Sequence, residues 1–232
     1  MTDVLKLECN IALLPDESLA DKLADVSQRL AERHPTIVQL GRAGQRLTLA
    51  PHLTLYQVAL PVNNLPEAGR RLHQTAAQQP ALQDVAATRY AYNEDEASFE
   101  VQRGMLDKLL SVQNTVVQEI NPLRQGLLVE RDPAGNQLST LLHAPDPLGT
   151  NIRRTGYAEV DDPRHGGLFR PHDTLNWFQP GTSVDINAES LPPLQTLRGS
   201  YRAIGLFALG PHGTCPQLLA EYPLAASAPP HH

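Results

Sequence analysis

Two short stretches, Pro51-His52-Leu53-Thr54-Leu55 and Pro171-His172-Asp173-Thr174-Leu175, carry the same His-x-Thr pattern directly after a proline. Each stretch opens a run of residues typical of a β-strand. Because alternate residues of a strand project from the same face, each histidine shares a face with its threonine. If the two strands lie side by side, two imidazoles and two hydroxyls converge on one place. The pattern therefore predicts a site that binds a phosphate and moves two protons.

Length and composition narrow the class of protein. The chain has 232 residues, 41% hydrophobic and 19% charged, which fits one large globular domain or two small lobes. No apolar run approaches the roughly 20 residues that span a bilayer, and the first residues lack the features of a signal peptide. Two widely separated cysteines, Cys9 and Cys215, favour a reduced cytoplasmic protein. The net charge of −6 argues against broad binding of nucleic-acid backbones.

Hydrophobic periodicity predicts a chain of strands and helices. A buried strand is expected over residues 5–14, and Asp16 is expected to cap the helix that follows it. Asn64, with Glu67 three positions later, predicts a capping box at the start of a second helix. The remaining predictions are a helix over 105–123, a strand or hairpin over 46–60, and strands over 84–92, 97–102, 156–160, 168–178, 201–209 and 218–222.

The chain resembles the 2H phosphoesterase superfamily, and within it the bacterial 2′-5′ RNA ligase-like branch. Four stretches carry the resemblance: APHLTL at 50–55, GYAEV at 156–160, LFRPHDTL at 168–175 and LGPHGTCPQLL at 209–219. The resemblance implies an α+β, bilobal fold, in which two pseudo-symmetric lobes place antiparallel sheets on either side of a central cleft. Residues 1–224 are then a single domain with an insertion or long connection at 124–151, and residues 225–232 are a disordered tail.

The resemblance assigns catalysis to His52 and His172, and phosphate binding to Thr54 and Thr174. Histidine suits both acid and base roles because its unperturbed pKa is about 6.5. The implied function is metal-independent hydrolysis of a cyclic 2′,3′-type or 2′-5′ phosphodiester of a nucleotide or short RNA, by a cytoplasmic monomer without a cofactor. Two alternatives stay open, a reversible 2′-5′ RNA ligase and a nucleotide- or RNA-binding protein without turnover. The sequence does not say which histidine is the acid.

Three further residues are candidates for substrate binding. Arg170 lies two positions before His172 and is expected to share its face. Tyr56 lies two positions beyond Thr54 and is a candidate either to stack on a base or to pack in the core. His165 lies in the turn that precedes the second motif.

Other sites fit the sequence poorly. A catalytic zinc needs about three protein ligands, and each motif supplies one histidine. No Gly-x-Ser-x-Gly elbow and no Walker-type loop occur.

Trp177 has the opposite parity from His172 and is expected in the core unless its strand bulges. Asp173, where the family usually has an apolar residue, is expected either to pair with a basic group or to reach the sheet edge, because a buried unpaired carboxylate is costly.

Overall fold

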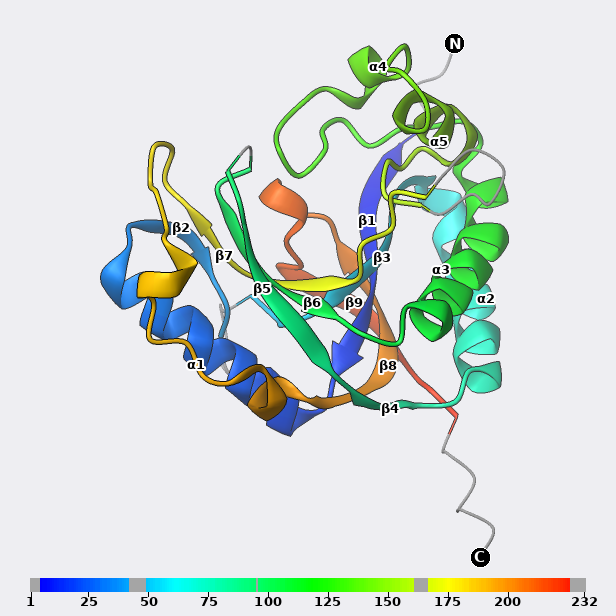
Figure 1. Cartoon of the computed structure of the whole chain (residues 1–232). Helices are drawn as coiled ribbons and strands as arrows, with labels where there is room; N and C mark the ends of the chain where they lie inside the picture. The colour runs from blue at the N-terminus through cyan, green and yellow to red at the C-terminus, as the bar shows by residue number, and fades with distance from the viewer. Residues whose placement is uncertain (1–4, 42–48, 95, 161–166, 226–232) are drawn as a thin grey trace, which may run out of the picture.

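The fold is built on an antiparallel sheet in two halves (Figure 1), seen in a computed structural model that describes residues 5–41, 49–94, 96–160 and 167–225. The strand order is β4-β8-β1-β3-β7-β6-β5, with β9 beside β8 and β2 beside β7. One half contains β1 (Lys6–Pro15), β3 (Leu53–Pro61), β4 (Leu82–Val85), β8 (Gly199–Ala208) and β9 (Gln217–Pro223). The other half contains β2 (Thr36–Gln39), β5 (Ala87–Asn93), β6 (Ser98–Arg103) and β7 (His172–Phe178).

The two halves meet between the two strands that carry the His-x-Thr motifs. Among the described residues, β3 and β7 pair at one position, where Leu53 lies opposite Asp173. Within each half the pairing is much longer, for example between β1 and β3 or between β6 and β7. The α+β architecture in two lobes that the sequence predicts is confirmed.

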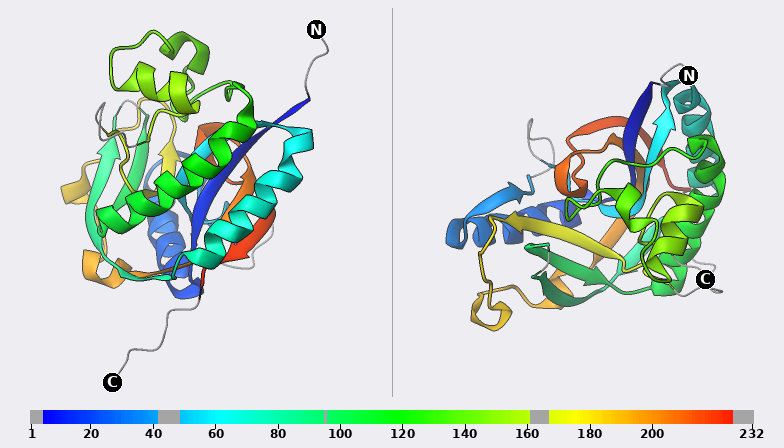
Figure 2. Two further views of the ribbon diagram at one scale, coloured as in Figure 1. Left: turned by 90° about the vertical axis from the view of Figure 1, so that its right-hand side faces the viewer. Right: turned by 90° about the horizontal axis from the view of Figure 1, so that it is seen from above.

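Each half of the sheet is packed against a helix that follows a strand of the other half. Helix α1 (Glu17–Arg33) follows β1 but packs against β7 and β2. Helix α3 (Leu106–Ile120) follows β6 but packs against β3, beside α2 (Leu65–Gln78), as Figure 2 shows. The two halves therefore exchange helices. No helix within the described ranges is long and apolar enough to cross a membrane.

The start of α1 follows the prediction and the start of α2 does not. The Oδ1 atom of Asp16 accepts a hydrogen bond from the backbone N–H of Leu19 (2.8 Å), which is an N-cap. Asn64 instead donates its side-chain amide to the carbonyl oxygen of Leu123 (2.7 Å), while Glu67 forms ion pairs within α2. The predicted capping box is wrong because a 3₁₀ turn, Val62–Asn64, puts Asn64 in a helical rather than an extended conformation.

Two predicted strands also differ. Residues 84–92 belong to two strands, because β4 joins β8 whereas β5 pairs with β6. Residues 156–160 form no strand: they follow α5 (Leu148–Thr155), which ends at Gly156 in a left-handed conformation. The 124–151 segment contains the short helix α4 (Leu138–Leu141) and the first half of α5, and its apolar side chains pack on Ala59 of β3.

The unusual Asp173 lies in a buried polar cluster directly beneath the junction of the halves. Arg103 donates its Nε–H to the Asp173 carboxylate, and the hydroxyl of Tyr201 donates to the same group (2.8 Å). The side chains of Arg103 and Asp173 are both fully buried. A second N–H of Arg103 reaches the carbonyl oxygen of Leu197 (2.6 Å). The expectation that Asp173 pairs with a basic group is thus met by Arg103.

Candidate active site

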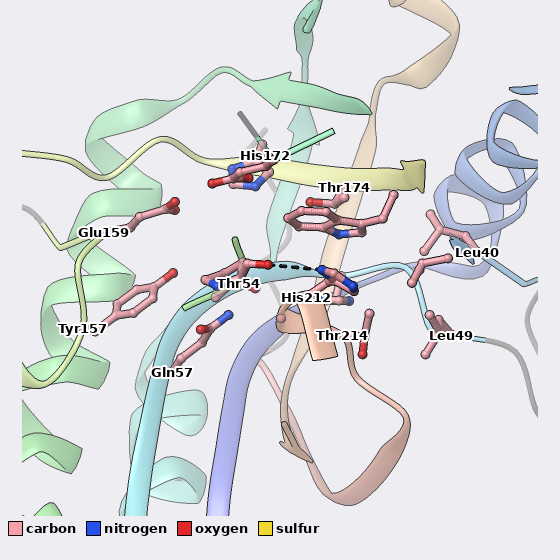
Figure 3. Close-up of a pocket in the computed structure, with 16 residues that line it drawn as sticks. Leu40, Leu49, Thr54, Gln57, Tyr157, Glu159, His172, Thr174, His212 and Thr214 are labelled. Carbon is pink, nitrogen blue, oxygen red and sulfur yellow. Dashed lines mark hydrogen bonds between the residues drawn. The ribbon is translucent and has the colours of Figure 1, made fainter. Parts of the chain in front are cut away.

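The two His-x-Thr motifs line one pocket where the halves meet (Figure 3). His52 and Thr54 come from the start of β3, and His172 and Thr174 come from β7. The pairing of Leu53 with Asp173 sets the two motifs beside each other. The structure therefore brings together all four residues that the resemblance assigns to catalysis and phosphate binding.

The two histidine rings are held in the same way. Nδ1 of His52 lies 2.8 Å from the carbonyl oxygen of Ala50, and Nδ1 of His172 lies 2.6 Å from the carbonyl oxygen of Arg170. Because a carbonyl oxygen only accepts, each Nδ1 must carry the hydrogen, and Nε2 of each ring is left for chemistry. Both rings are half-buried, so each is fixed but reachable from the pocket.

Asn10 of β1 orients the hydroxyl of Thr54. Its amide donates to Thr54 Oγ1 (3.2 Å) and to the carbonyl oxygen of Gly213 (2.9 Å). Since the Thr54 oxygen already accepts this bond, its own hydrogen is free to be donated into the pocket. A hydroxyl prepared in this way suits an anionic oxygen.

The two halves differ in the residue that lies opposite each threonine. Glu100 of β6 lies opposite Thr174, whereas Ala12 of β1 lies opposite Thr54. Glu100 is buried, with 1% of its side chain exposed, and its Oε2 atom lies 3.5 Å from Nε2 of His172. Its other oxygen accepts a hydrogen bond from the guanidinium of Arg170. The pocket is therefore pseudo-symmetric in its histidines but not in the charge beside them.

His52 has the environment of a neutral imidazole. Burial lowers the pKa of His52, and a protonated His172 lowers it further. The Ala50 carbonyl and the negative charge of Asp173 oppose this shift without reversing it. His52 is thus the ring that favours the neutral form.

A β-bulge follows the threonine of each motif. Between β1 and β3 the register shifts so that Leu55 is the extra residue, and between β6 and β7 the extra residue is Leu175. A bulge reverses the alternation of side chains. As a result Gln57 and Trp177, three positions beyond Thr54 and Thr174, both line the pocket.

The helices exchanged between the halves support these bulges. A bulged residue leaves a backbone group outside the ladder, and a buried group of this kind needs another partner. The carbonyl oxygen of Leu55 accepts from the Gln113 amide of α3 (3.0 Å), and that of Leu175 accepts from the Ser27 hydroxyl of α1 (2.8 Å). Each helix thereby holds a motif strand in its bulged form.

The bulges decide the direction of two side chains. Tyr56 is fully buried, and its hydroxyl donates to the carbonyl oxygen of Thr155, so it packs in the core and does not line the pocket. Trp177, expected in the core unless its strand bulges, is buried and forms part of the pocket wall, in keeping with the bulge. Arg170 does not line the pocket, because its guanidinium is bound to Glu100. His165 lies outside the described residues.

The opposite wall of the pocket comes from the loop between β8 and β9. The ring of His212 packs on the indole of Trp177, with 4.8 Å between ring centroids. Its Nδ1 lies 3.2 Å from the carbonyl oxygen of Pro133, the bond dashed in Figure 3. Pro133 belongs to the 124–151 segment, so that segment reaches the site. The sequence shows no pattern that singles out His212 beyond its place in one of the four stretches of resemblance.

Carboxylates are the charged side chains of the pocket wall. Among the described lining residues, Glu96 and Glu159 are acidic and none is Lys or Arg. Burial raises the pKa of Glu96, and the nearby Glu159 raises it further. In the described part of the chain, no group of three His, Cys, Asp or Glu side chains is arranged to hold a metal ion. The imidazoles of the pocket can transfer protons, and its hydroxyls can donate hydrogen bonds.

Comparisons with solved structures give the fold. TT0787 of Thermus thermophilus superposes with a TM-score of 0.57 at 18% identity, covering 96% of this chain and all of that one. Escherichia coli LigT in complex with phosphate gives 0.54 at 13% identity, covering 95% and 98%. LigT with 3′-AMP gives 0.52 at 13% identity, covering 95% and 99%. No protein-family model and no curated protein sequence matches the chain.

Proposed function

We propose that this protein, whose fold is that of the 2H phosphoesterases, is a metal-independent phosphodiesterase acting on a cyclic 2′,3′-type or 2′-5′ phosphodiester of a nucleotide or short RNA. The observation that carries the proposal is the pair of histidines on one pocket, each held through Nδ1 by a backbone carbonyl. The crystallised complexes of LigT with phosphate and with 3′-AMP support it, because those ligands have the chemistry that this pocket suits.

The difference between the two histidines assigns their roles in this proposal. His52, which favours the neutral form, takes a proton from the attacking water. His172, beside the buried carboxylate of Glu100, carries the proton that passes to the departing ribose oxygen as its bond to phosphorus breaks. Arg170 binds the other oxygen of Glu100. Each imidazole contributes on the order of 10²–10⁴ in rate.

The threonines bind the phosphate in this mechanism. Negative charge builds on the non-bridging oxygens as water adds, and hydroxyl donors held in place stabilise that charge. Thr54 is oriented by Asn10 for this purpose. Thr174 occupies the equivalent place on β7.

Turnover of adenosine 2′,3′-cyclic phosphate by single variants tests the proposal. His52→Ala and His172→Ala should each lower kcat by about 10²-fold or more with the fold intact. Thr54→Ala and Thr174→Ala should lower it by about 10–100-fold, since each removes one of several phosphate contacts. His73→Ala, an exposed histidine of α2, is the matched control. Wild-type activity in His172→Ala would contradict the acid–base pair.

A further inference from the structure

A second cavity, of about 260 Å³, opens beside the pocket and runs beneath the 124–151 segment. It shares five lining residues with the pocket: Gln57, Glu96, Pro133, Tyr157 and Glu159. Figure 3 shows Gln57, Tyr157 and Glu159 at one end of the pocket, away from Leu40 and Leu49. The far wall of the cavity is apolar, formed by side chains such as Leu138 and Leu148. We call this cavity the insertion subsite.

Gln57 is a largely buried residue whose amide is reachable at the mouth of the insertion subsite. Only 3% of its surface is exposed, yet neither of its amide atoms is among the described buried polar atoms that lack a hydrogen-bond partner. It lines the pocket, the insertion subsite and a third cavity next to them. Its amide can therefore donate to and accept from a ligand in these cavities. A ligand with both a donor and an acceptor, such as the edge of a nucleobase or a ribose hydroxyl, matches it.

The charges of the insertion subsite indicate what it does not bind. Glu96 and Glu159 line both the pocket and the insertion subsite, and Asp132 adds a third carboxylate to the insertion subsite. The pocket offers histidines and threonines that can donate to a phosphate, whereas no His, Thr, Lys or Arg is among the described lining residues of the insertion subsite. A phosphate placed here would meet like charges in partly desolvated surroundings, which is unfavourable. An uncharged, flat group suits the apolar wall instead.

From these observations we infer that the insertion subsite binds the nucleoside attached to the reacting phosphate, that Gln57 hydrogen-bonds it, and that a further phosphate is rejected. The inference rests on the proposed function and narrows its substrate class. The substrate is then a nucleotide with one phosphate, placed at the histidine pair, rather than an internal linkage of a longer RNA. In this inference the 124–151 segment forms the wall of the insertion subsite and so selects the substrate.

Three cyclic phosphates test the inference by turnover. Adenosine 2′,3′-cyclic phosphate should have a kcat/KM at least about tenfold above glycerol 1,2-cyclic phosphate, which lacks the nucleoside, and above the same nucleotide carrying a 5′-phosphate. Gln57→Ala should lower the ratio of the adenosine to the glycerol substrate by about three- to tenfold, through KM. Leu148→Trp should lower it further by filling the cavity. Glu159→Gln should weaken the discrimination against the 5′-phosphate.

A control variant and a binding measurement distinguish failure of the insertion subsite from failure of the proposed phosphodiesterase function. Leu218→Trp, an exposed leucine of the edge strand β9, matches Leu148→Trp in size change. Calorimetric titration with 3′-AMP and with inorganic phosphate needs no turnover. If Leu148→Trp weakens only 3′-AMP binding and no cyclic phosphate is turned over, the insertion subsite stands and the proposed function falls. If the wild type is active and neither Gln57→Ala nor Leu148→Trp changes the substrate ratio, the insertion subsite is overturned.

Discussion

At the scale of single residues, one glutamate distinguishes two histidines that are otherwise held alike. Both rings use Nδ1 to bind the carbonyl two residues before them. The residue opposite the neighbouring threonine is Ala12 in one half and Glu100 in the other. Groups that face His172 also include Glu96 and Arg170, but Glu100 is the carboxylate placed at its Nε2. The two halves therefore differ in charge beside their histidines, because only His172 has a carboxylate at its Nε2.

This asymmetry predicts the pH dependence of catalysis. The profile of kcat/KM should be bell-shaped, with its acid limb set by His52 and its basic limb by His172. Since burial lowers the pKa of His52, the acid limb should lie below about 6.5. Glu100→Gln removes the charge that stabilises the imidazolium, so the basic limb should move to lower pH and the profile should narrow.

The measurement is kcat/KM across the range in which histidine titrates, with NMR titration of both rings in the free protein. Glu119→Gln, an exposed glutamate of α3, is the control. A glutamate with only a structural role would lower activity at every pH without moving one limb. A basic limb unchanged in Glu100→Gln, or a His52 ring that holds its proton to higher pH than His172, would reverse the assignment.

At the scale of elements, the bulges mark the point in each motif strand beyond which the sequence no longer predicts the face on which a side chain lies. Strand alternation places each histidine with its threonine correctly, because these residues precede the bulge. Simple alternation no longer holds for Tyr56 and Trp177, which follow the bulges, so Tyr56 lies in the core and Trp177 lines the pocket. The bulge depends on pairing with a neighbouring strand and on Gln113 and Ser27, which lie far away in the sequence. No local pattern in the motif strands reports these partners.

Glu100 had a weaker signal in the sequence. It stands in β6 between Phe99 and Val101, which are both fully buried. Together with Ser98 and Gln102 it forms a set of polar residues that alternates with these apolar ones. This alternation indicates a polar face on that strand. It does not reveal that the face lies beside His172, because that follows from the pairing of β6 with β7.

The junction of the two halves gives a prediction about stability. Asp173→Ala leaves the Arg103 guanidinium buried without its partner, so the free energy of unfolding should fall by about 3–5 kcal/mol. Tyr201→Phe removes a hydrogen bond to a charged group and should lower it by about 1.5–3 kcal/mol. Urea denaturation monitored by circular dichroism measures both. Glu221→Ala breaks a surface ion pair with Arg202 and should change stability by less than about 1 kcal/mol. An Asp173→Ala effect no larger than that of Glu221→Ala would show that the buried pair is not holding the junction.

At the scale of the whole molecule, the site exists only when both halves are folded together. Each half supplies one His-x-Thr strand, and the helix that supports each motif strand enters from the other half. The 124–151 segment then adds a wall that neither half provides. With a net charge of −6, the molecule does not attract phosphates generally. In the proposed function, recognition of the phosphate therefore depends on the hydroxyls and imidazoles of one pocket.

The proposed use of histidines as acid and base, without a metal, predicts that chelation leaves activity unchanged. A catalytic zinc needs about three protein ligands, and no group of three His, Cys, Asp or Glu side chains in the described ranges is arranged to hold a metal ion. In the proposed mechanism His52, not a metal, activates the water, so kcat/KM for adenosine 2′,3′-cyclic phosphate should be the same after dialysis against EDTA. The pH profile should also be unchanged by the chelator. Loss of activity in EDTA that zinc or manganese restores would mean that the histidines act as ligands, and the acid–base mechanism would have to be abandoned.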